Sequence, residues 1–206
     1  MMKRNNSFKA FTLLELMVVI AIVGVLAAIL IPSITGYIRK SQKAVDITNA
    51  KLVYEAVELV LLLDDNAADS FYKYNTGNWR RDGVNYLTIA KLNGTSSPKG
   101  GAAGSYYIWQ PGNNEAKGFT DALNESMGFV LTSNNSRQTP KVQMKCNSHS
   151  SGLRTDRWNI VVRKDGTERS VEIWASDSAS SGAGMIPNYR LWPNPDAEYN
   201  VENFDN

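Results

Sequence analysis

The feature that most constrains this chain is an apolar run near its N-terminus, over residues 11–31. As an α-helix the run would extend for roughly 31 Å, which matches the hydrocarbon core of a bilayer. The residues before it include Lys3, Arg4 and Lys9 and no acid. Because basic residues stay on the cytoplasmic side, we expect a single-pass protein of the cytoplasmic membrane with its later residues outside.

Three simpler interpretations of the run fit less well. A secretory signal peptide has a shorter apolar region than this one, which continues to Pro32. A plain transmembrane anchor has the right length but gives no role to Glu15, the one charged residue in the run. A buried core helix explains neither the basic residues in front of the run nor its lack of a polar face.

Glu15 has two possible explanations. A carboxylate inside lipid costs a few kcal/mol and points by default to a function. The alternative is that Glu15 only marks the membrane boundary, close to the headgroups. Phe11 and Glu15 are four residues apart and share a helix face. A cut between Ala10 and Phe11 would therefore place a new α-amine one turn from the carboxylate.

The segment KAFTLLEL, which begins at Lys9, resembles the processing site of type IV prepilins and of related type II secretion and competence pseudopilins. The resemblance implies that residues 1–10 are a leader peptide, that a prepilin peptidase cuts between Ala10 and Phe11, and that Phe11 becomes N-methylated. It also implies that Glu15 is the assembly carboxylate, which pairs with the N-terminal amine of a neighbouring subunit. The family prefers glycine before the cut, and the alanine at position 10 bears on the rate of processing.

The resemblance implies a structural subunit of a type IV pilus, used for adhesion or motility, and not an enzyme. Its expected partners are membrane lipid before assembly, the prepilin peptidase/methyltransferase, the pilus assembly platform with its ATPase, and further copies of the chain in a helical filament. One alternative is a minor pilin or a type II secretion or competence pseudopilin. Another is a membrane-anchored surface binding protein that never polymerises, which would keep residues 1–10.

The helix is predicted to continue beyond the apolar run to about residue 63. Pro32 lacks an amide donor and Gly36 is flexible, so these residues are expected to kink the helix, and Ile31 is the alternative end. Continuation is favoured because apolar residues recur at spacings of three, four or seven. The apolar stripe consists of Ile34, Ile38, Val45, Leu52, Ala56, Leu59 and Leu63. After Leu52 the apolar face broadens to include Val53, Val57 and Val60, which we expect to pack on a head.

The sequence therefore predicts an α+β fold, the pilin-like ladle: one helix over about 11–63, with an antiparallel sheet packed on its C-terminal half. Residues 11–38 form the membrane and filament-core half, 39–63 the amphipathic half, and 64–206 the head. In the head we expect short helices at 85–92 and 118–128, the second capped by Thr120 or Asp121. Strands are expected at 106–109, 129–131 and 141–145, with a hairpin of 158–163 and 170–174 around Asp165-Gly166 and one buried face.

Other chemistry has little support in the sequence. Cys146 is the only cysteine, which excludes an internal disulfide, and together with His149 it makes at most half of a metal site. No metal, cofactor or catalytic residue is expected. The net charge of +2 gives no general reason to expect a nucleic-acid partner. Aromatic and basic residues do occur together at 79–81 and 154–158, which leaves single-stranded nucleic acid or polysaccharide as weak candidate partners.

Overall fold

The computed structural model describes residues 11–73, 78–81, 84–92, 109–112, 114–129, 142, 144–146, 155, 157–165, 168–176 and 187–199. The chain divides into two compact units, Met1–Ser41 and Gln42–Asn206. Helix α1 contributes residues to both units, and the sheet and the other helices belong to the second. This second unit is called the head below.

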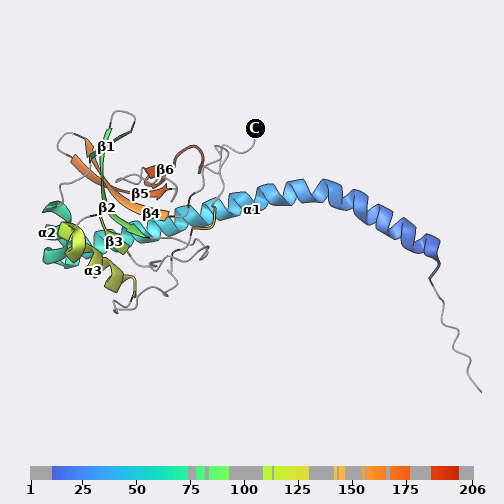
Figure 1. Ribbon diagram of the computed structural model, residues 1–206, viewed down its shortest axis with the longest axis horizontal. Coiled ribbons are helices and arrows are strands. Elements are labelled where there is room, and N and C mark those ends of the chain that lie inside the picture. The colour runs from blue at the N-terminus through green and yellow to red at the C-terminus, as the bar shows by residue number, and fades with distance from the viewer. Residues whose placement is uncertain are drawn as a thin grey trace, which may run out of the picture. The chain divides into compact units, whose positions relative to one another are not determined.

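Helix α1 runs from Leu13 to Leu63 without a break (Figure 1). The prediction of one long helix is confirmed, and the alternative end at Ile31 is wrong. A proline removes only one hydrogen bond of the helical ladder. Close to Pro32, the Thr35 hydroxyl donates a 2.7 Å hydrogen bond to the Pro32 carbonyl oxygen. The kink at Pro32 and Gly36 stays a prediction.

The head contains an antiparallel sheet with the strand order β1-β2-β4-β5-β6. Strand β3 also pairs with β2, at Ala90–Leu92, beyond the part of β2 that pairs with β1. The expected hairpin is confirmed as β4 and β5, which pair from Arg157–Ser176 to Asp165–Glu168. The strands are β1 Asn78–Arg81, β2 Val84–Leu92, β3 Trp109–Pro111, β4 Arg157–Asp165, β5 Glu168–Ser176 and β6 Pro187–Trp192.

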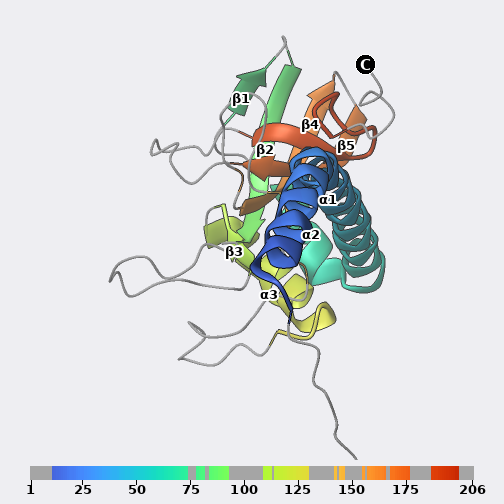
Figure 2. The same cartoon turned by 90° about the vertical axis from the view of Figure 1, so that its right-hand side faces the viewer.

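One face of the sheet packs on the head part of α1 (Figure 2). Ile160 of β4 and Ile173 of β5 are opposite each other and fully buried, and they belong to the same core as Val53 and Val57 of α1. The α+β, pilin-like fold is thus confirmed. Alternation along β5 predicted that only this face would be buried, but Glu172 and Trp174 of the opposite face are also buried.

Glu172 can be buried because its carboxylate is well paired. It accepts a 2.8 Å hydrogen bond from the Trp174 indole N–H. Its other oxygen lies 3.2 Å from the Arg190 guanidinium and 3.9 Å from that of Arg163. A buried charge needs partners of this kind, and strand alternation alone does not reveal them.

Four residues of the predicted apolar stripe do not face the core of the head. Val45, Leu52, Leu59 and Leu63 are 39%, 52%, 50% and 74% exposed. The face of α1 that the head covers is instead made of Lys43, Asp46, Ala50, Val53, Val57 and Val60. The prediction is confirmed for Val53, Val57 and Val60, and Ala56 of the stripe also packs against the core. It is wrong for Val45, Leu52, Leu59 and Leu63. The apolar residues of this face, Ala50 and three valines, are smaller than the exposed leucines and so let the sheet approach the helix closely.

Residues 85–92 form a strand, not the predicted helix. They belong to β2, where Ala90 pairs with Ile160 and Leu92 with Trp158. Pairing on both edges, with β1 and β4, overrides the weak local preference for a helix. The β-formers Tyr86, Thr88 and Ile89 also favour a strand here.

The predicted helix at 118–128 is confirmed as α3, Lys117–Ser126, but its N-cap is Ala116 and not Thr120 or Asp121. A further helix, α2 Asp65–Lys73, follows α1 and is not among the elements predicted for the head. The Asp64 carboxylate accepts the Ala67 N–H at 2.9 Å and so caps this helix. The aspartates that end α1 therefore start α2.

Two strand predictions fail where the structure describes the chain. Phe129 and residues 142 and 144–146 are not in strands, and the rest of those two segments lies outside the described residues. Residues 145 and 146 direct their backbone N–H groups to Asp46 instead of to a neighbouring strand. Trp109 begins β3, and residues 106–108 lie outside the described chain.

Candidate functional site

The first turn of α1 holds Glu15 in a reciprocal cap. The Thr12 hydroxyl accepts the Glu15 N–H at 3.2 Å, and Glu15 Oε2 accepts the Thr12 N–H at 2.9 Å. The same oxygen accepts the Thr12 hydroxyl proton at 2.9 Å. This is a capping box, with Thr12 as the N-cap residue and Glu15 three residues later. The pattern T-x-x-E in the sequence could have revealed it.

The cap fixes the position of the Glu15 carboxylate at the helix N-terminus. In the described part of the chain only Oε2 is used by the cap, so Oε1 points to no protein donor. A negative charge here is favourable because the first N–H groups of a helix carry partial positive charge. Phe11, beside it, is 82% exposed. Glu15 is thus preorganised for a cation that approaches the start of the helix.

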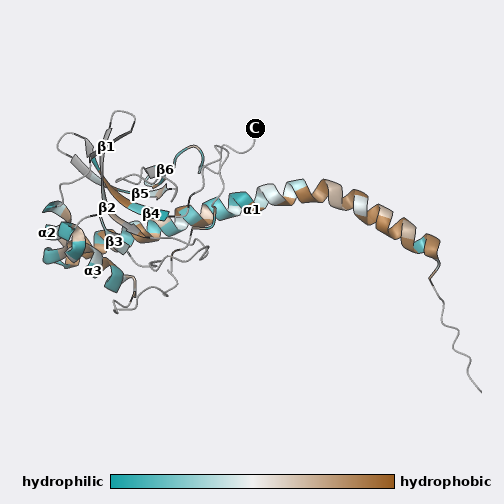
Figure 3. Ribbon diagram, viewed as in Figure 1, coloured by the Kyte–Doolittle hydropathy of each residue, from teal (hydrophilic) through white to brown (hydrophobic). Residues whose placement is uncertain are grey.

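The first half of α1 exposes its apolar side chains on every face. From Phe11 to Ile38 the large apolar residues are 50–82% exposed, and this half is the hydrophobic part of the helix in Figure 3. Helix α1 is long and apolar enough to cross a membrane. An apolar surface of this size requires lipid or other apolar helices around it.

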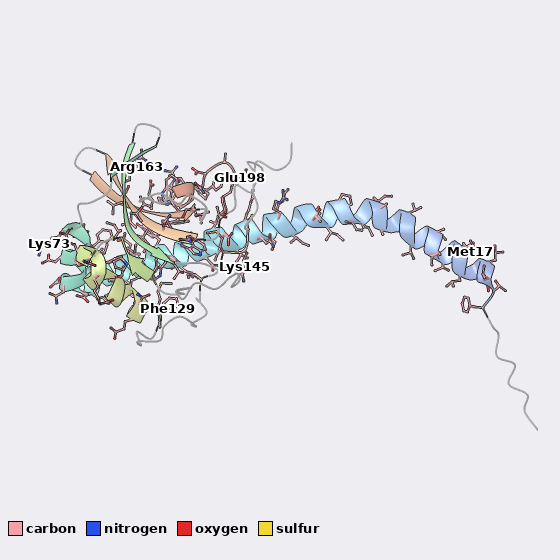
Figure 4. All side chains as sticks on the ribbon, in the orientation of Figure 1. Met17, Lys73, Phe129, Lys145, Arg163 and Glu198 are labelled. Atoms are coloured by element: carbon pink, nitrogen blue, oxygen red, sulfur yellow. The ribbon has the colours of Figure 1, made fainter. Side chains whose placement is uncertain are left out.

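At the start of the head, two charged residues of α1 are buried and hold distant segments of the chain. The Lys43 amine donates to the Glu198 carbonyl oxygen and lies 3.0 Å from the Glu198 carboxylate. Its amine also lies over the Tyr199 ring, 5.8 Å from the centroid. In the view of Figure 4 the labelled Glu198 and Lys145 lie above and below this part of α1.

Asp46 binds the segment on the other side. Its two carboxylate oxygens accept the backbone N–H groups of Lys145, at 2.7 Å, and of Cys146, at 2.8 Å. Burial of this carboxyl, which lies in the head and outside the apolar half of α1, raises its pKa to about 7; the two N–H bonds and the Lys145 charge oppose the rise. We name Lys43 and Asp46 the polar clasp. Residues 43 and 46 continue toward the N-terminus the three- and four-residue spacing of Ala50, Val53 and Val57. This spacing could have indicated from the sequence that the polar clasp lies on the buried face.

Comparisons with known proteins agree with this arrangement. A family profile described as the prokaryotic N-terminal methylation motif matches residues 5–31. The type IV major fimbrial protein FimA of Dichelobacter nodosus is 41% identical over 70 residues, which are 34% of this chain and 45% of FimA. The chain therefore spans less than half the length of that relative. The type IV major pilin protein PilE of Neisseria gonorrhoeae is 38% identical over 96 residues, 47% of this chain and 48% of PilE.

A further relative is matched along most of its length. The type IV major pilin protein PilE1 of Neisseria gonorrhoeae is 30% identical over 168 residues, 80% of this chain and 89% of PilE1. The chain belongs to the type IV pilin family. No solved structure matches this pilin.

Two of the remaining candidates from the sequence, Cys146 and Trp158, belong to the head. Cys146 of this pilin is buried beside the polar clasp, and its carbonyl oxygen accepts the Thr155 hydroxyl proton at 2.9 Å. Trp158 is fully buried in the core and so cannot stack on a base or a sugar. In the described part of the chain no three His, Cys, Asp or Glu side chains come together as metal ligands.

Some candidates lie outside the described chain. These are Ala10, His149 and the side chains of residues 79–81. The cleavage, the methylation and the assembly role of Glu15 stay predictions.

Proposed function

We propose that this pilin is stored in the cytoplasmic membrane with residues 1–10 inside, cut between Ala10 and Phe11, N-methylated on Phe11 and assembled through α1 into a surface filament. The filament would serve adhesion or motility. One observation carries the proposal: the first half of α1 is apolar and exposed on every face. Lipid covers such a helix before assembly, and the same helices of other copies cover it afterwards.

Glu15 gives the assembly its register. Apolar packing alone leaves helices free to slide, whereas a charge pair in a medium of low dielectric has one preferred position. The cap uses Oε2, and Oε1 is left for an amine. In the bilayer this amine is that of Phe11 in the same chain, and in the filament it is that of the next subunit.

The proposal names the machinery that the chain needs. A prepilin peptidase/methyltransferase removes residues 1–10, and an assembly platform with its ATPase extracts the helix from the bilayer. Ala10 stands at the position before the cut, and alanine is the smallest replacement for the glycine that the family prefers there.

Mass spectrometry of the protein in a sheared surface fraction of its native cells tests this proposal. We expect a mature N-terminus at methylated Phe11, abundant in long filaments. An intact N-terminus at Met1, found only in membranes, would refute processing and assembly and favour an anchored binding protein. Processed protein in low amounts without long filaments would instead indicate a minor pilin or a pseudopilin.

A further inference from the structure

The head contains a pocket of about 450 Å³ between the last turns of α1, helix α2 and the sheet. Its lining residues come from α1, α2, β4 and β5, and from Pro193 beyond β6. The volume falls in the range of about 300–1,000 Å³ that is typical of sites for small molecules. The proposed filament function gives this pocket no role.

Aromatic rings form a large part of the lining. Tyr54 of α1 and both Phe71 and Tyr72 of α2 contribute to it. The rings of Phe71 and Tyr72 are nearly perpendicular, at 87°, and their centroids are 5.3 Å apart. Phe71 is buried, whereas Tyr72 is 51% exposed. Phe71 therefore belongs to the closed part of the pocket, and Tyr72 to its mouth.

Glu58 is the one charged residue among the described residues that line the pocket. It lies one helical turn after Tyr54, and the Tyr54 hydroxyl is hydrogen-bonded to its carboxylate. The surrounding chain is also acidic, because residues 55–69 contain five acidic residues and no basic one. The two lysines that flank this segment each pair with one of its other acids. These charges favour a cationic ligand over an anionic one.

The aromatic rings beside the pocket already hold a cation of the chain itself. Trp192 packs on Tyr54, with the ring centroids 6.2 Å apart. The Lys51 amine lies 5.7 Å from the centroid of the Trp192 ring. This distance is typical of a cation–π contact, in which the negative face of the ring attracts a positive group. The rings that line the pocket can attract a cation in the same way.

We propose that this pocket, which we name the aromatic pocket, binds a quaternary ammonium group such as that of choline. The methyl groups pack on the rings of Tyr54, Phe71 and Tyr72, and the positive charge lies beside the Glu58 carboxylate. A primary ammonium fits less well because its three N–H donors need acceptors when they are buried, and Glu58 is already hydrogen-bonded to Tyr54. A quaternary ammonium has no such donors.

Titration calorimetry of the full chain in a maltoside detergent, with choline as the probe, tests this proposal. We expect saturable binding at millimolar choline or below. The neutral isostere of choline, in which carbon replaces the ammonium nitrogen, should bind at least about tenfold more weakly. Ethanolamine, which carries a primary ammonium, should also bind more weakly. Absence of saturable choline binding, or equal binding of the isostere or of ethanolamine, would overturn the proposal.

Substitution of Glu58 tests whether its charge contributes to binding in this pocket. Glu58→Gln keeps the shape of the side chain and removes its charge, so it should weaken choline binding about fivefold or more. Glu55→Gln, one turn earlier on α1 and outside the lining, is the matched control and should change the affinity by about twofold at most. Equal effects of the two substitutions would contradict a direct contact with Glu58.

Substitution of Tyr72 tests the aromatic contact. Tyr72→Leu removes a ring at the mouth of the pocket and should weaken choline binding about 2- to 30-fold. Tyr72→Phe keeps the ring and should bind choline nearly as well as the unaltered protein. An unchanged urea midpoint of each variant verifies that the head is folded. Unaltered choline binding by Tyr72→Leu would overturn the role of the ring.

Glycerophosphocholine separates two sources of the ammonium group, a soluble compound and a lipid headgroup. Because the surroundings of the pocket are acidic, its phosphate should weaken binding relative to free choline, which indicates a soluble compound. Tighter binding of glycerophosphocholine would support the same site with a lipid headgroup as its ligand. All these titrations use unassembled protein, so their outcome is independent of the proposed filament function.

Discussion

The buried carboxyl of Asp46 makes the stability of the head depend on pH in a direction opposite to that of an ordinary salt-bridged acid. Burial raises its pKa from 3.8 to about 7 in the folded chain. Between these two values the folded state therefore holds a proton that the unfolded state has lost. By linkage, Asp46 contributes stability that is fully present below pH 3.8 and is lost as the pH rises through 7.

The size of the effect follows from the shift. A rise of about 3 pKa units corresponds to about 4 kcal/mol, and relaxation of the backbone around the charge can reduce this to about 2 kcal/mol. Other carboxyl groups also titrate at low pH, so the effect must be isolated by comparison with Asp46→Asn. The amide cannot lose a proton. It also loses one of the two bonds from Lys145 and Cys146, at a cost of about 1–2 kcal/mol that does not vary with pH.

The measurement is urea unfolding of the full chain in mild detergent, at several pH values from 4 to 8. All five tryptophans lie at positions 79–192, so their fluorescence reports on the head. The unaltered protein should exceed Asp46→Asn in stability at pH 4, and the difference should shrink by about 2–4 kcal/mol by pH 8. A difference that is constant over this range, or that grows with pH, would refute the reasoning and show that the two N–H bonds outweigh burial.

Three other substitutions test individual contacts of the chain. Glu15→Gln keeps an acceptor for the helix cap but removes the charge, so we expect filament yield to fall as much as in Glu15→Ala, and a normal yield from the Gln variant would exclude a role for the charge. Lys43→Met keeps the volume but removes the bonds to Glu198, and unfolding in urea should show a loss of about 1–3 kcal/mol; no loss would mean that the clasp does not stabilise the head. Asn124→Ala removes the buried bonds to the Trp109 N–H at 2.8 Å and carbonyl at 2.9 Å, with an expected loss of about 2–4 kcal/mol by the same measurement; a loss below 0.5 kcal/mol would show that water replaces the amide.

The long helix and the hairpin could be predicted because their signals are local. The run at 11–31 has a length set by the bilayer, and apolar spacing carries the helix on to Leu63. The β4–β5 hairpin has β-branched residues on both sides of Asp165-Gly166, so neighbours in sequence are also neighbours in space. The helix at Lys117–Ser126 was likewise found from its own residues, although its first residue was misplaced.

The buried face of α1 could not be predicted in this way because its partners are distant in sequence. Both Val45 and Asp46 lie at positions that helical spacing allows in a stripe, and apolarity favoured Val45. Asp46 is buried because residues 145 and 146 supply two N–H groups, and Lys43 because Glu198 supplies two oxygens. Such pairing is visible only once the fold has brought these segments together.

At the start of α1 the functional residue was predicted, but its hydrogen bonds to a near neighbour in the sequence were not. The resemblance predicted an assembly carboxylate at Glu15 but gave it a single task, and the structure adds the cap with Thr12. The pattern T-x-x-E at residues 12–15, which is typical of a capping box, is present in the sequence. A residue with two roles must be tested by a change that removes one role at a time.

The two faces of α1 in the head differ in burial, and we expect them to differ in their effects on stability and assembly. Val53 and Val57 are fully buried against the sheet, so truncating them creates cavities and unfolds the head before any filament can form. Leu52 and Leu59 touch little in the isolated chain and are half exposed. Leu52→Ser with Leu59→Ser should therefore leave the urea midpoint of the head nearly unchanged and still reduce filament yield. Truncation of Val53 or Val57 is thus expected to lower stability, and the two serine substitutions to lower filament yield alone. Comparing the two kinds of variant would identify an assembly surface that a stability measurement alone would miss.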